Sequence, residues 1–325
     1  MSRVFVTGGS GFVGRYVLDV LLAEGCEVSA LTRRPRERRP GLEWIVGELD
    51  TPETYGRALR GADAVIHLAA LIAARRVRDF DRSNVQGTRT LLRACAAGRA
   101  RPRRVVVVSS IAAAGPKHDG SLLTEGDACR PRSAYGASKL AGEREALALA
   151  DQVLVTILRP SYVYGPGDAR GAEHLHTLLQ HAGRPWCTPI ATLSLIHAAD
   201  LARACFLALR SAVPSGSLYL ISDSQIHTWD SLRRAVAGAL MALAREGALH
   251  PRLADVLIAR AEALEVTARG AARYDYWACD TARARAELGL TARPLVEGAL
   301  ETIGCYVRQG LFAPASAVRR TARAV

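Results

Sequence analysis

The chain has 325 residues, of which 49% are hydrophobic and 23% are charged, a balance typical of a globular protein with one large α/β domain or two interlocked ones. The formal charge of +12 would suit a nucleic-acid partner, but the arginines are spread along the chain and only 6% of the residues are aromatic, so basic and stacking side chains do not alternate. The sequence contains no run of eighteen apolar residues and no signal peptide. We therefore expect a cytoplasmic protein whose partners include neither a nucleic acid nor a membrane.

The seven cysteines are scattered along the chain and include no Cys-x-x-Cys pair. An odd number of cysteines without such a pair argues against a zinc site and against a disulfide framework, and it fits a reducing compartment. We expect no metal site.

The first predicted strand, at 4–7, ends in a run of glycines that recur at three-residue intervals. A helical pattern of apolar residues follows at 15–24, and a second predicted strand follows at 27–31. This order predicts a dinucleotide-binding βαβ unit, because glycines permit a tight turn and the free N–H groups of the helix N-terminus bind a pyrophosphate. The cofactor contacts expected in this turn are Gly8, Gly11, Phe12, Val13 and Gly14.

The segment Thr-Gly-Gly-Ser-Gly-Phe-Val-Gly at 7–14 resembles the glycine motif of the short-chain dehydrogenase/reductase superfamily, in particular its extended branch of NAD-dependent epimerases and dehydratases. The resemblance implies an α/β fold with a Rossmann-type, doubly wound parallel sheet and a smaller, interlocked C-terminal substrate domain. It implies a nucleotide domain of residues 1–168 plus 193–221, and a substrate domain of residues 169–192 plus 222–325. A homodimer is also implied.

The end of the second predicted strand carries arginine where an NAD-binding protein would place an acid for the ribose diol. A guanidinium suits a 2′-phosphate through its charge and its forked hydrogen bonds. We therefore expect NADP, with NAD as the alternative, and we expect Arg33 to be the main phosphate contact and Arg34 a further one. The competing interpretation is that the arginines from 33 to 39 form a basic surface loop.

The next two predicted strands, at 43–46 and 64–70, lead to further cofactor contacts. Small residues at the end of the second of these strands allow the cofactor to approach the backbone, and the resemblance implies contacts after the first strand and at the start of the following helix. We interpret His67, inside the buried strand, as a core histidine. The contacts expected are Glu48, where the family more often has Asp, and Leu49, Leu68, Ala69, Ala70 and Asn84.

Tyr135 and Lys139 lie four residues apart in a predicted helix, so both side chains occupy one face. The lysine cation is expected to lower the pKa of the phenol, which could then exchange a proton with an alcohol or a carbonyl. A predicted strand at 104–108 ends at Ser110, at the edge where doubly wound sheets bind ligands, and Ser109 is the alternative. The resemblance implies that Tyr135, Lys139 and Ser110 form the catalytic group, with Tyr135 and Lys139 also contacting the cofactor.

A predicted strand at 153–158 runs into Arg-Pro-Ser-Tyr-Val-Tyr-Gly-Pro, which resembles the family segment that passes the nicotinamide, and this implies contacts from Pro160 and Ser161. A second family-like segment follows at 194–200, where we interpret His197 as structural and Asp200 as a helix cap. Later helices are expected at 229–244, 253–265, 280–289 and 296–309.

The segment at 186–193 is largely apolar, whereas sugar-nucleotide enzymes of the family have a polar, glycine-rich turn there and a later Arg-x-Gly-Asp cluster that this chain lacks. An apolar pocket suits a hydrophobic ketone or alcohol. We therefore expect an NADP-dependent ketone or aldehyde reductase, or an alcohol dehydrogenase, acting on a small or hydrophobic metabolite. This is nearer the 3-beta-hydroxysteroid dehydrogenase and dihydroflavonol reductase side of the branch. The alternative is an NAD-dependent nucleotide-sugar epimerase or dehydratase.

Overall fold

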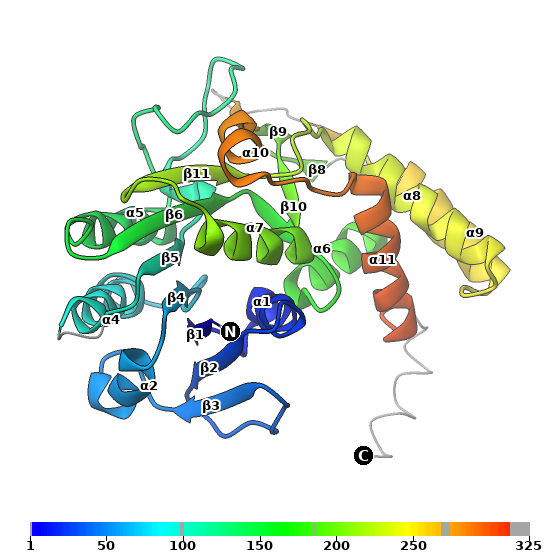
Figure 1. The fold of residues 1–325 in the computed structure, drawn as a ribbon. Coiled ribbons are helices and arrows are strands. Elements are labelled where there is room, and N and C mark those ends of the chain that lie inside the picture. The colour runs from blue at the N-terminus through cyan, green and yellow to red at the C-terminus, as the bar shows by residue number, and fades with distance from the viewer. Residues whose placement is uncertain (1, 98–100, 185, 268–273, 313–325) are drawn as a thin grey trace.

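The computed structural model describes residues 2–97, 101–184, 186–267 and 274–312. Its centre is a seven-stranded parallel sheet in the order β11-β6-β5-β4-β1-β2-β3 (Figure 1). The chain order reverses between β1 and β4, so the carboxyl ends of these strands flank the crevice where such sheets bind ligands. The strands are β1 (Arg3–Thr7), β2 (Glu27–Thr32), β3 (Leu42–Val46), β4 (Ala64–His67), β5 (Arg104–Val108), β6 (Leu154–Pro160) and β11 (Ser217–Ile221).

Helices cover both faces of this sheet, because successive strand side chains point to opposite sides. Val4 and Val6 of β1 pack in the core beneath α1 (Phe12–Ala23) and α7 (Ala198–Arg210). Phe5, between them, packs in the core of the other face, which contains residues of α2 (Gly56–Arg60), α4 (Gly87–Ala96) and α5 (Ala134–Leu147). The expected Rossmann-type fold is confirmed.

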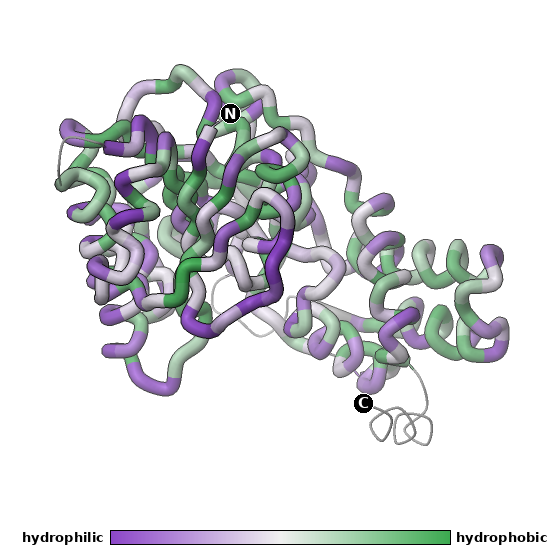
Figure 2. Tube along the Cα trace, turned by 60° about the horizontal axis from the view of Figure 1, so that its bottom comes forward, coloured by the Kyte–Doolittle hydropathy of each residue, from purple (hydrophilic) through white to green (hydrophobic). Residues whose placement is uncertain are grey.

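A further hydrophobic core lies beside the sheet, in addition to the cores on its two faces. It is formed by apolar faces of α6 (Ala169–Gln180), α8 (Trp229–Arg245), α9 (Pro251–Glu262) and α11 (Leu295–Arg308). Figure 2 shows these helices projecting from the sheet region, with hydrophobic and hydrophilic positions interleaved along them. Two short strand pairs join this part, β8 (Trp186–Cys187) with β12 (Val266–Thr267) and β9 (Ile190–Leu193) with β13 (Asp275–Trp277).

The last part of the chain connects this helical core to the core on the α1 and α7 face of the sheet. Although α10 (Ala282–Leu288) lies within the predicted substrate-domain range, its residues Ala284 and Leu288 pack in the core of α1 and α7. The helix ends at Gly289, whose φ of 68° is the left-handed conformation that glycine adopts most readily. Another connection is the parallel pair of β7 (Tyr162–Tyr164) and β10 (Leu195–His197). The remaining short elements are η1 (Pro52–Thr54), α3 (Val77–Phe80), η2 (Asp81–Gln86) and η3 (Ile111–Ala113).

The structure corrects two predictions made from the sequence. The strand expected at 64–70 ends at His67, and residues 68–70 continue as a loop. The prediction that Asp200 caps a helix is wrong, because the His197 side chain accepts the cap hydrogen bond from the Ala199 N–H. Asp200 instead pairs with Arg293, whose backbone N–H and guanidinium both donate to its carboxylate.

Candidate active site

A cavity of about 1460 Å³ runs along the carboxyl ends of the central strands, from the glycine turn to Tyr135. Single small-molecule sites usually measure about 300 to 1,000 Å³, so this cavity has room for a dinucleotide and a second molecule. Of the residues expected at the site, only Arg34 and Asn84 do not line it. Those that do are Gly8, Gly11, Phe12, Val13, Gly14, Arg33, Glu48, Leu49, Leu68, Ala69, Ala70, Ser110, Tyr135, Lys139, Pro160 and Ser161.

The glycine turn is packed too closely for larger residues. Gly8 has a φ of 74°, and a Cβ there would lie 2.7 Å from the backbone nitrogen of Ala69. A Cβ on Gly14 would clash with the backbone oxygen of Gly8. The next helix begins at Phe12 without a side-chain cap, so N–H groups of its first turn remain free for an anion. These residues fit the pyrophosphate of a dinucleotide cofactor.

The end of the cavity where the sequence predicts the adenosine contains charged residues from several loops. Arg33 follows β2 and lines the cavity, whereas Arg34 lies outside it and accepts a hydrogen bond from Thr32 Oγ1 at its backbone oxygen. Arg82 and Asp50 both line the cavity and form an ion pair with 2.9 Å between the guanidinium nitrogen and the carboxylate oxygen. Sequence reasoning missed this pair, because 32 residues separate its members in the chain.

Asn84 does not line the cavity, but its hydrogen bonds support a residue that does. Its side chain is only 2% exposed, accepts a hydrogen bond from the Leu71 N–H and donates to the Leu71 carbonyl. It also donates to Ser138 Oγ, with 2.9 Å between the two atoms. The amide therefore links the loop after β4 to α5, and the direct cofactor contact expected from the sequence stays a prediction.

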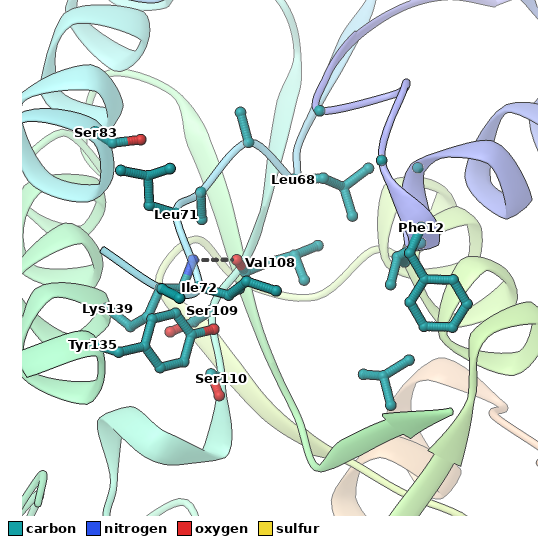
Figure 3. A pocket seen from close by; sticks show the side chains of 18 of the residues that line it. Phe12, Leu68, Leu71, Ile72, Ser83, Val108, Ser109, Ser110, Tyr135 and Lys139 are labelled. Atoms are coloured by element: carbon teal, nitrogen blue, oxygen red, sulfur yellow. Dashed lines mark hydrogen bonds between the residues drawn. The ribbon is translucent and has the colours of Figure 1, made fainter. Parts of the chain in front are cut away.

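Tyr135 reaches the cavity because α5 begins very close to η3. Ser133 caps α5 by accepting a hydrogen bond from the Gly136 N–H, and a Cβ on Gly136 would clash with the backbone oxygen of Ala112. The Ser110 hydroxyl caps η3 by accepting from the Ala112 N–H. This close approach brings the Tyr135 phenol and the Ser110 hydroxyl to the same part of the cavity (Figure 3).

Lys139 lies beside Tyr135 and donates a hydrogen bond from Nζ to the backbone oxygen of Val108, at 2.8 Å (Figure 3). Burial lowers the pKa of Lys139 to about 8, while the nearby Glu143 carboxylate acts in the opposite direction. Burial raises the pKa of Tyr135, and a hydrogen bond with Ser110 and the charge of Arg170 oppose that rise. The expected lowering of the tyrosine pKa by Lys139 is therefore wrong for this structure.

The alternative serine, Ser109, takes part in a buried network behind the cavity. Its hydroxyl donates to Glu143 Oε1 at 2.5 Å, and the Arg159 guanidinium donates to both oxygens of the same carboxylate at 2.8 and 2.6 Å. Glu143 is 2% exposed and Arg159 is 3% exposed. Ser109 also borders the cavity, but its hydroxyl is committed to Glu143, which leaves Ser110 as the serine beside the phenol.

At the nicotinamide end expected from the sequence, β6 ends at Pro160, and Ser161 follows. The Ser161 hydroxyl is buried and has no hydrogen-bond partner within the described residues. A buried hydroxyl without a partner is costly, so a polar group of a bound molecule would stabilise it. This orphan hydroxyl also fits a cofactor in the cavity.

The apolar pocket expected from 186–193 is not part of this cavity. β8 is exposed at both residues, and β9 pairs with β13, which brings Trp277 to the cavity instead. The far end of the cavity is lined by residues that the sequence did not single out: Leu71, Ile72, Ala73, Ala74, Tyr162, Tyr164, Asp168, Arg170, His174 and Trp277.

His67, in β4 of the sheet, has a structural role rather than a chemical one. His67 is 2% exposed, and its two ring nitrogens lie 2.6 Å from Thr7 Oγ1 and 2.9 Å from Thr88 Oγ1. Burial lowers its pKa to about 3, so it stays neutral. Its interpretation as a core histidine is confirmed.

All seven cysteines are free thiols. Within the described ranges, no group of three His, Cys, Asp or Glu side chains could hold a metal ion. Over the same part of the chain, none of the helices combines the length and the apolar character needed to span a bilayer.

Comparison with known proteins assigns the family. Residues 4–222 match the model of the NAD dependent epimerase/dehydratase family. A ceramide reductase of Caulobacter vibrioides is 33% identical over 250 residues, covering 74% of this chain and 72% of the relative. A 4-hydroxy-2-methyl-3-oxo-4-farnesyl-3,4-dihydroquinoline-1-oxide ketoreductase of Stigmatella aurantiaca is 33% identical over 233 residues, covering 68% of each chain.

Among solved structures, MoeE5 in complex with UDP-glucuronic acid and NAD superimposes with a TM-score of 0.75 at 28% identity, covering 94% of this chain and 99% of MoeE5. The matched family segment contains both the glycine turn and the Tyr135–Lys139 pair. The chain therefore belongs to the NAD-dependent epimerase/dehydratase family, within the extended short-chain dehydrogenase/reductases, and is an NAD(P)-dependent oxidoreductase.

Proposed function

We propose that this enzyme interconverts a carbonyl compound and the corresponding alcohol with NADP as its cofactor. The observation that carries the proposal is the convergence of Tyr135 and Ser110 in the same cavity as the glycine turn. The names of two relatives, a ceramide reductase and a ketoreductase, support carbonyl reduction over sugar-nucleotide chemistry.

When bound, the nicotinamide supplies or accepts the hydride. Tyr135 donates its phenolic proton to the carbonyl oxygen during reduction, and it accepts that proton during oxidation. Ser110 holds the same oxygen by a hydrogen bond, which orients the carbonyl for reaction. Lys139 binds the ribose next to the nicotinamide, while Ser161 and Pro160 border the ring.

NADP rather than NAD is favoured by charge at the end of β2. Arg33 lines the cavity there, and no acidic residue occupies the position that would bind a ribose diol. Within the described residues, Arg33 forms no ion pair, so its guanidinium is available to a 2′-phosphate.

Cofactor binding tests the NADP assignment. NADPH should raise the melting temperature more than NADH does, and Arg33→Ala should remove that difference by weakening NADPH binding about tenfold or more. Arg34→Ala is the matched control, because this neighbour lies outside the cavity. Equal stabilisation of the wild-type protein by the two cofactors would contradict the NADP assignment.

A panel of ketones and aldehydes, followed by the loss of NADPH absorbance, tests the reaction itself. The competing function is a nucleotide-sugar epimerase or dehydratase, which the fold similarity to MoeE5 with its UDP-sugar and NAD keeps as a specific alternative. NAD that remains bound through purification, together with stabilisation by UDP-glucose, would favour that alternative.

A further inference from the structure

The helix α6 brings two basic side chains to the catalytic end of the cavity. Arg170 and His174 lie one helical turn apart, and both line the cavity that Tyr135 and Ser110 enter. The charge of Arg170 is close enough to the phenol to lower its pKa against the effect of burial. A molecule bound at Tyr135 therefore shares the cavity with Arg170.

Arg170 lines the cavity, and no carboxylate of the described residues pairs with it. Within the described residues, neither Arg170 nor His174 takes part in an ion pair or a side-chain hydrogen bond. The acid nearest to it in sequence, Asp168, also borders the cavity. However, its carboxylate packs against the first turn of α6, where a Cβ on Gly171 would clash with it. The guanidinium therefore keeps its donors for a ligand.

Part of the surrounding surface is apolar. The loop after β4 contributes Leu71, Ile72 and two alanines, and β13 contributes Trp277. Ile72 is 55% exposed and lines the cavity, so its aliphatic side chain is accessible to a ligand there. This end of the cavity thus places apolar side chains beside the Arg170 guanidinium.

We propose that the substrate is an amphipathic carbonyl compound whose anionic group, a carboxylate or a phosphate, binds Arg170, while its apolar part lies against Ile72 and Trp277. This rests on the proposed carbonyl function and adds a substrate class to it. A forked guanidinium forms two charge-assisted hydrogen bonds with either anion, and an apolar surrounding strengthens them. A neutral ketone of the same length would make neither of these charge-assisted hydrogen bonds.

Binding tests the inference without any turnover. Calorimetry with the NADP⁺-saturated protein would compare three ten-carbon probes: decanoate, decyl phosphate and the neutral decanamide. We expect at least one anion to bind the wild-type protein about tenfold or more tightly than the amide, and Arg170→Gln to abolish that preference. Arg252→Gln, on the exposed surface of α9 outside the cavity, should behave as the wild-type protein does.

Two results would overturn the inference. One is a wild-type protein that binds the amide as tightly as both anions, and the other is an anion preference that survives Arg170→Gln. Because Arg170 is exposed, its replacement is not expected to affect folding, and an unchanged melting temperature would check this.

An activity assay distinguishes a failure of this inference from a failure of the proposed carbonyl function. A series of 2-, 3- and 4-oxodecanoates, each paired with its methyl ester, would be assayed by NADPH oxidation. We expect kcat/KM for one acid to exceed that of its ester about tenfold or more, and the ratio to fall towards one in Arg170→Gln. If neither acids, esters nor other carbonyls are reduced, the carbonyl function fails, whereas the calorimetric result still decides whether Arg170 binds an anion.

Discussion

The Lys139 ammonium donates a hydrogen bond to the backbone carbonyl of Val108, with 2.8 Å between the two atoms. This contact ties α5 to the end of β5, one residue before the serine pair. Burial raises the pKa of the neighbouring Tyr135 phenol.

Lys139 should make stability depend on pH in the alkaline range. Burial lowers its pKa from 10.5 to about 8, so between these values the unfolded chain binds a proton that the folded protein lacks, and stability rises with pH there. Lys139→Met should be more stable than the wild-type protein near pH 7, by up to about 3 kcal/mol, and this gap should close towards pH 10. Urea unfolding at several pH values measures it.

The control for Lys139 is the only other lysine, Lys117, whose ion pair with Asp127 raises its pKa. Lys117→Met should not show a stability gain that disappears above pH 8. Parallel stability curves for Lys139→Met and the wild-type protein would refute the assignment of a buried ammonium.

Removal of the Tyr135 hydroxyl should abolish proton transfer and leave the fold intact. Tyr135→Phe keeps the ring that packs 6.2 Å from the Phe80 ring, so NADPH binding should be unchanged. Turnover should fall about 100-fold or more, as expected for the loss of a general acid. Tyr274→Phe, outside the cavity, is the control, and a Tyr135→Phe enzyme with more than about a tenth of wild-type activity would argue against the mechanism.

Alanine at position 14 should disrupt the cofactor turn. A Cβ there clashes with the backbone oxygen of Gly8, which cannot move without opening the turn. Gly14→Ala should lower stability by about 1 to 3 kcal/mol and weaken dinucleotide binding. Gly238→Ala is the matched control, because that helical glycine has open space around it and should gain about 0.5 to 1 kcal/mol. Thermal unfolding and NADPH fluorescence titration would separate the two variants.

The two acids at 143 and 145 of α5 should differ widely in importance. Glu143→Gln would leave the buried Arg159 charge without a counter-ion and should cost about 3 to 5 kcal/mol. Glu145→Gln breaks a more exposed pair with Arg89 and should cost less than about 1 kcal/mol. Similar unfolding midpoints in urea for the two variants would show that the Glu143 pair does not stabilise the fold.

The elements that the sequence predicted well depend on neighbours along the chain. The strand–glycine–helix order at 4–24, the apolar strand at 104–108 and the helix end at Gly289 follow from periodicity and local backbone preference. The four-residue spacing of Tyr135 and Lys139 likewise identified a shared helical face. These patterns also supported the resemblance that matched the family.

The predictions that failed concern distances in space. The segment at 186–193 is apolar, yet it lies outside the cavity because β9 pairs with β13. Asp200 has a residue type that suits a cap, but Arg293, 93 residues later, takes its carboxylate. Neither partner could be identified from local spacing.

The sequence by itself determined the doubly wound architecture and the set of groups available for chemistry, because both follow from short-range patterns of side chains and glycines. Only the tertiary structure decided which groups face each other. It directed Lys139 to Val108 and brought Arg170 to the phenol. The physical reason is that pKa values and ion pairs depend on burial and on through-space distance, which are set by packing between elements far apart in the chain.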